Sequence, residues 1–230
     1  MTSGFYRKAF TMLELVFVIV VVGILAATMA PRFTRDNLQE AADQVVSHLR
    51  YTKHLAMVDE KFSSTDSGWY KTRWQVLFAN TVGSDNQWAY TIFSDTAGSH
   101  TGNPDVSEIA KDPINNNVYL TGGYSAGTIP YNSSKANKSM NLGNKFGIED
   151  VNSTNCGNTS GNMPIRIAFD YLGRPIIKNL NSSTKPYQKS RILKEQCKIS
   201  ICTVNPCTSA SSSEKITIAI EPITGYIHIL

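Results

Sequence analysis

Charged residues are scarce in this chain. Asp, Glu, Lys and Arg make up 17% of its 230 residues, whereas they account for about 25% of an ordinary soluble protein. Asn, Ser, Thr and Gly supply the polarity instead. A composition of this kind favours an exported, β-rich domain over a cytosolic enzyme.

Sequence signatures of catalysis are also missing. The chain has no GxSxG elbow, no HExxH helix, no Walker loop and no GxGxxG turn after a strand. His48 and His54 are six residues apart on a predicted helix and do not share a face, which argues against a metal pair. Residues 95–105 and 149–158 contain acidic and Asn oxygens, but neither segment fits a calcium-loop pattern. We therefore assign no catalytic residue, no metal site and no cofactor.

The surplus of basic residues is too small to indicate a nucleic-acid partner. The chain has 22 Lys and Arg residues, and without Arg7 and Lys8 at its start 20 of them remain against 18 Asp and Glu. A balance this close to neutrality gives no case for nucleic acid.

The chain has only four cysteines, and all of them lie in its C-terminal third: Cys156, Cys197, Cys202 and Cys207. No two have CxxC spacing and the histidines are scattered, so a zinc site is disfavoured. An even number of cysteines in an exported domain favours disulfides. Four cysteines allow three pairings, and the sequence does not choose among them. One pairing joins Cys202 to Cys207 around a short loop and leaves Cys156 with Cys197.

One long apolar run spans residues 10–30, and its only ionisable side chain is Glu14. A helix of this length measures about 30 Å, enough to cross the hydrocarbon core of a bilayer. The basic residues before it favour a cytoplasmic N-terminus. A cleaved secretory signal has a shorter apolar region. An ordinary membrane anchor explains the length and the flanking charges, but not a carboxylate that costs roughly 3 kcal/mol within a membrane helix.

The start of the chain carries two basic residues, a small residue, a Phe and then a Glu four positions further on: Arg7, Lys8, Ala9, Phe10 and Glu14. Followed by an unbroken apolar run, this motif resembles the class III signal of type IV pilins and pseudopilins. The resemblance implies cleavage by a prepilin peptidase between Ala9 and Phe10, N-methylation of Phe10, and an assembly contact through Glu14. Ala9 departs from the family pattern, which usually has Gly before the cut.

Pro31 ends the apolar run, and the resemblance implies that it kinks a helix that continues. Beyond it, apolar and small residues recur at alternating four- and three-residue steps, which predicts an amphipathic helix ending near residue 62. The stripe consists of Leu38, Ala42, Val45, Leu49, Thr52 and Ala56. We expect it to lie against a globular domain and to leave the opposite face for neighbours.

The remainder of the chain is predicted to form short strands separated by turns. A hairpin is expected from residues 73–79 and 88–93, and another from 165–169 and 175–177. Further strands are expected at 197–204, 215–220 and 226–230, with the last two antiparallel. Residues 94–161 are polar and rich in Gly, Asn and Ser, and a loop of that length is usually functional or mobile.

Asn152 is a candidate glycosylation site. It begins an N-x-S/T sequon that follows Asp150 and Val151, and so resembles the acidic-preceded sequon of bacterial N-glycosylation.

Three further segments narrow the resemblance. The helix end at residues 44–57, the strand and turn at 169–175, and the closing hairpin around Thr224 are similar to the GspH/FimT group of minor pseudopilins. This resemblance implies an α+β, pilin-like fold after loss of the leader, residues 1–9. A long helix over residues 10–62, transmembrane over 10–30 and then amphipathic, would pack on an antiparallel β-sandwich domain of residues 63–230.

The implied function is that of a minor pseudopilin at or near the tip of a type II secretion pseudopilus. The chain would be a single-pass protein of the inner membrane with its β-rich domain in the periplasm. Its partners would be other pseudopilins, contacted through the N-terminal helix, the prepilin peptidase, and the inner-membrane assembly platform. A minor pilin of a type IV pilus or DNA-uptake system is an alternative, and only that alternative brings nucleic acid. A membrane-tethered periplasmic enzyme is a second alternative.

Overall fold

The computed structural model describes residues 12–98, 100–125, 127–157 and 164–230, and for residues 28–36 it describes the backbone only. The chain divides into two compact units, Met1–Asp36 and Asn37–Leu230. Helix α1 (Met12–Val58) begins in the first unit and ends in the second. Each unit is described below by itself.

The described part of the second unit contains two four-stranded antiparallel sheets. The strand order is β2-β1-β4-β5 in the first sheet and β3-β6-β7-β8 in the second. A short helix, α2 (Leu142–Phe146), precedes β3. The strands are β1 (Trp74–Asn80), β2 (Trp88–Ser94), β3 (Asp150–Thr154), β4 (Ile165–Phe169), β5 (Pro175–Ile177), β6 (Cys197–Cys202), β7 (Lys215–Ile220) and β8 (Ile227–Ile229).

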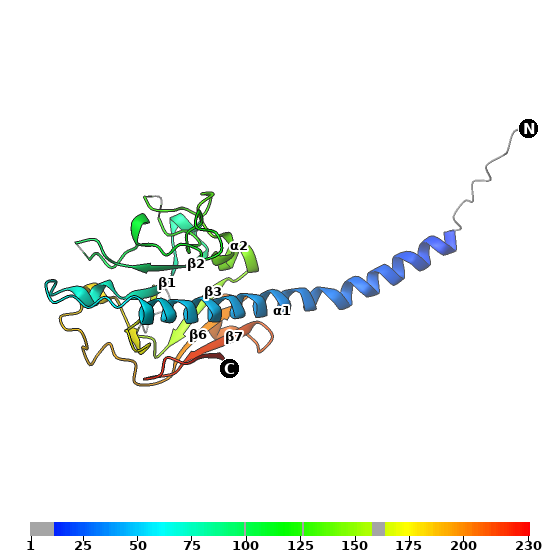
Figure 1. The fold of residues 1–230 in the computed structure, drawn as a ribbon. Coiled ribbons are helices and arrows are strands. Elements are labelled where there is room, and N and C mark those ends of the chain that lie inside the picture. The colour runs from blue at the N-terminus through cyan, green and yellow to red at the C-terminus, as the bar shows by residue number, and fades with distance from the viewer. Residues whose placement is uncertain (1–11, 99, 126, 158–163) are drawn as a thin grey trace, which may run out of the picture. The chain divides into compact units, whose positions relative to one another are not determined.

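The second half of α1 forms the centre of the core. All six residues of the predicted stripe are buried, from Leu38 to Ala56, and Val45 and Leu49 have no exposed surface. These side chains share one hydrophobic cluster with residues of both sheets, including Phe78 of the first and Ile199 of the second. In Figure 1, this part of α1 runs between β1 and β2 on one side and β6 and β7 on the other. The amphipathic pattern is therefore confirmed, although α1 ends at Val58 rather than near residue 62.

Both predicted hairpins are confirmed. β1 pairs with β2, and β4 pairs with β5, each antiparallel. β4 also pairs with β1, which joins the two hairpins into one sheet. The closing strands β7 and β8 are antiparallel as expected.

The polar stretch at residues 94–161 is more ordered than the sequence predicts. It contains α2 and β3. Isolated antiparallel bridges also connect it to β2, between Phe93 and Ile109 and between Thr91 and Thr121. Side chains of this stretch form a second apolar cluster on the first sheet's other face, where Ile109, Ile129 and Ala136 pack with Leu77 and Phe93. The stretch therefore covers a face of the first sheet that would otherwise be exposed to water.

The predicted membrane span is wrong. Across the residues that the structure describes, no helix combines the length and the apolar character needed to cross a bilayer. The transmembrane part of the expected fold class and the single-pass inner-membrane localisation are corrected accordingly.

A hydrogen-bonded chain of polar side chains ties α1 to the first sheet. Gln44 Nε2 donates to Tyr90 Oη at 2.7 Å and to the Ser139 carbonyl at 2.8 Å. Tyr90 Oη lies 2.6 Å from His48 Nδ1. Burial raises the pKa of Tyr90, so its hydroxyl stays protonated. Burial also lowers the pKa of His48, with Asp112 opposing the effect, which favours the neutral imidazole.

Stability should fall in acid because of His48. The folded state lowers the pKa of His48 below that of the unfolded chain, about 6.5, so the unfolded state binds more protons below that pH. The His48 contribution is therefore present above about pH 6.5 and lost as the pH falls through the lowered value. We expect His48→Gln to flatten the fall in melting temperature between neutral and mildly acidic pH. The exposed His54→Gln should leave that fall unchanged, and identical pH profiles for the two variants would contradict this account.

The four cysteines form two disulfides, Cys156–Cys197 and Cys202–Cys207. The first connects the end of β3 to the start of β6, and the second closes the turn that follows β6. All four sulfur-bearing residues are buried. The prediction of disulfides is confirmed, and the short-loop pairing is the one the chain adopts.

The two disulfides should differ in their contribution to stability. The bridged residues are 41 positions apart in one and 5 in the other, and loop-closure entropy gives about 4 and about 2 kcal/mol respectively. Replacing both Cys156 and Cys197 by Ala should lower the free energy of unfolding more than replacing both Cys202 and Cys207. Denaturant unfolding of the two double variants measures this, and an equal or reversed loss would refute the ranking.

Candidate assembly site

The first part of α1 presents apolar side chains to solvent on every side. All residues from 12 to 27 are exposed, with Phe17 at 69% and Ile24 at 61% of their full exposure. A helix that is apolar all round is normally buried, because each large apolar side chain left in water forgoes about 1.5–3 kcal/mol. This stretch of α1 is therefore a surface suited to packing against other helices.

Glu14 is the acidic residue in the first turn of α1 and is exposed. A carboxylate there is favoured by the partial positive charge of the helix N-terminus. Leu13 and Leu15 flank it, both more than half exposed. Once those neighbours are covered by another helix, the local dielectric falls and the carboxylate attracts a cation more strongly. The geometry suits an ion pair formed across a helix–helix contact.

Small residues occur among the large apolar ones in the later part of residues 12–27. Ala26 and Ala27 are exposed, and a Cβ added at Gly23 would meet nothing within 4 Å. Small residues allow the axes of packed helices to approach closely. Ala30, which continues the series in the sequence, lies where only the backbone is described.

The other N-terminal predictions remain predictions. Ala9 and Phe10, the expected cleavage and methylation site, lie outside the described residues. Pro31 lies within α1, whose helical backbone continues on both sides of it.

Asn152 lies on β3 and is half-buried. Its Oδ1 accepts a hydrogen bond from the backbone N–H of Ser153 at 2.7 Å, and its Cα is paired with that of Ser200 on β6. Glycosylation at this position stays a prediction.

The two acidic segments considered for calcium do not converge on a site. Asp95 is buried, and its Oδ2 accepts from the Gly102 N–H at 2.6 Å. Burial raises the pKa of Asp95, against the opposing effect of that hydrogen bond. Within the described ranges, no group of three or more His, Cys, Asp or Glu side chains is arranged to hold a metal ion.

A feature that the sequence analysis missed is a hollow of about 320 Å³ in the second unit, here called the lysine hollow. It is lined by Lys178, Lys189 and Lys194 together with Ile177 and Ile192. The sequence does contain one indication of this hollow. Residues 178–198 include six Lys and Arg residues but only one carboxylate.

Comparison of the chain with protein-family models, with curated proteins and with solved structures found no match.

Proposed function

We propose that this chain is a structural subunit of a pilin-like filament, with the motifs of a minor pseudopilin of a type II secretion system. The observation that carries the proposal is the apolar surface of α1 over residues 12–27, exposed on every side. Water is a poor environment for such a surface. The apolar helices of neighbouring subunits cover it and form the filament core.

The N-terminal motif determines how neighbouring helices are positioned along each other. Cleavage between Ala9 and Phe10 discards Arg7 and Lys8 and leaves a free amine on Phe10. Glu14 then lies about one helical turn from that amine. The carboxylate of one subunit pairs with the amine of an adjacent subunit, because opposite charges attract more strongly once the covered apolar surface lowers the local dielectric. This pairing fixes the stagger between neighbouring helices.

The globular unit does not have to change for the helix to assemble. Its core uses the stripe of α1 that begins at Leu38, and those side chains are already buried within the unit. None of residues 12–27 belongs to that hydrophobic cluster. A subunit can therefore join a filament through one part of α1 while the other part keeps the β-sheets folded.

The N-terminus of the mature protein tests the class directly. We expect the intact mass and N-terminal peptides of the protein from its native host to give a chain starting at N-methylated Phe10. A mature chain starting at unmodified Met1 would overturn the proposal. In a deletion strain, loss of protein secretion with normal twitching and transformation supports the secretion pseudopilus, and the opposite pattern supports a pilus or DNA-uptake system.

Glu14 should be needed for assembly and not for folding. Removing one partner of a buried ion pair costs about 3–5 kcal/mol, so Glu14→Ala should reduce recovery of the chain with its partner subunits by more than tenfold, and Glu14→Gln should not restore it. Glu40 is an exposed carboxylate further along the same helix, and Glu40→Ala is the matched control. Co-purification after crosslinking measures the effect. Equal recovery of the Glu14 and Glu40 variants would remove Glu14 from the assembly contact.

A further inference from the structure

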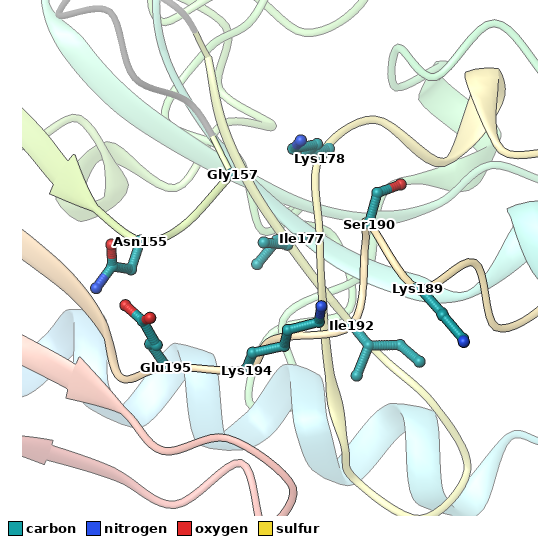
Figure 2. A pocket seen from close by; sticks show the side chains of 9 residues that line it. All are labelled: Asn155, Gly157, Ile177, Lys178, Lys189, Ser190, Ile192, Lys194 and Glu195. Atoms are coloured by element: carbon teal, nitrogen blue, oxygen red, sulfur yellow. The ribbon is translucent and has the colours of Figure 1, made fainter.

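The lysine hollow is bounded by the end of β5, by residues 189–195 and by Asn155 and Gly157. Ile177, at the end of β5, provides aliphatic surface. The side chain of Ile192 lies on the opposite face, because Ile192 bridges Ile176. Lys178, Lys189, Lys194 and the single carboxylate, Glu195, complete its charged rim. Figure 2 shows Lys194 extending toward Ile192 along one side, while the Lys189 ammonium points away from the centre. The hollow is thus an aliphatic floor with cationic edges.

The lysines of this rim outnumber its one carboxylate, Glu195. Lys178, Lys189 and Lys194 are exposed, and none of them forms an ion pair with any residue in the described ranges. Like charges gathered around one hollow repel each other and concentrate positive potential there. A bound anion relieves that repulsion.

Ile192 leaves an open backbone edge on the side away from β5. Ile192 bridges Ile176 antiparallel, and the flanking bonds run from Ile177 N–H to the Arg191 carbonyl at 2.8 Å and from Leu193 N–H to the Pro175 carbonyl at 3.4 Å. In this pattern the N–H and C=O of Ile192 itself point away from β5. Neither has a backbone partner among the residues that the structure describes. Ile192 also lines a second cavity of about 130 Å³ on its other side.

We propose that the lysine hollow binds an extended acidic segment of a partner protein. An aliphatic side chain of the segment packs against Ile177, and its flanking carboxylates lie against Lys178 and Lys194.

The lining favours a peptide over the other anionic partners. Nucleic-acid bases need aromatic or guanidinium planes to stack on, and the residues lining the hollow include neither. Glu195 on the rim repels a continuous phosphate chain but tolerates carboxylates spaced along a peptide. A free phosphate ion leaves the aliphatic floor unused. The proposal does not depend on filament assembly, because no lining residue belongs to α1.

The test uses the full-length protein and a fluorescent peptide with a central isoleucine flanked on both sides by aspartates. We expect saturable binding by fluorescence anisotropy, weakened about tenfold or more by the double change Lys178→Glu and Lys194→Glu. The milder pair Lys178→Gln and Lys194→Gln should weaken binding in the same direction. Lys185→Glu removes an equally exposed charge of the same segment outside the hollow, and it should weaken binding less than about twofold. Melting temperatures show that each variant is folded.

Three results would overturn the proposal. The first is equal affinity for a peptide with asparagine in place of every aspartate, which removes the role of charge. The second is an equal loss of affinity in the Lys185→Glu variant, which means that the attraction is not localised in the hollow. The third is displacement of the peptide by inorganic phosphate or by a single-stranded oligonucleotide at the same concentration as unlabelled peptide, which assigns the hollow to a different anion.

Discussion

The contact between α1 and the two sheets is the interaction on which the globular unit depends. Ala42, Val45 and Leu49 are fully buried there, and they belong to one cluster with residues of both sheets. Burying side chains of the Val and Leu type contributes about 1.5–3 kcal/mol each. The two sheets share no paired strand, so the helix supplies the apolar surface that holds them in one core.

The same helix meets two different requirements along its length. From Leu38 onward its apolar residues keep a helical period and leave a polar face, which is the pattern of a helix buried on one side. Over residues 12–27 apolar side chains cover the whole circumference and are exposed. Nothing in the globular core calls for that second pattern. In the proposed filament, contacts with other chains account for this pattern, and Glu14 in the first described turn adds an electrostatic preference to the apolar one.

The sequence predicted best where a local pattern is tied to burial. The stripe from Leu38 to Ala56 keeps a helical period, and its residues are buried. The β-branched and aromatic segments predicted as strands correspond to β1, β2 and β7. The order within residues 94–161 could not be predicted from such patterns. Its order comes from isolated bridges such as Lys111 with Tyr119 and from apolar residues spaced far apart, such as Ile109 and Ile129. Contacts between residues so far apart leave no periodic pattern in the sequence.

The candidate sites divide in the same way. Glu14 could be identified from sequence because one carboxylate in an apolar run is a local anomaly, and its exposure on α1 agrees with a surface role. The lysine hollow could not, because Lys178 and Lys194 are ordinary surface residues until β5 and the segment around Ile192 bring them to one rim. The membrane span expected from the apolar run is not found among the residues that the structure describes.

The apolar surface of α1 and the lysine hollow use forces with different dependence on solution conditions. Packing of apolar helices is non-directional and is strengthened by salts that are excluded from protein surfaces. Attraction between exposed lysines and carboxylates is screened over about 8 Å at physiological ionic strength. The two surfaces also lie on separate parts of the sequence, residues 12–27 and 155–195, so each can be altered without touching the residues that form the other.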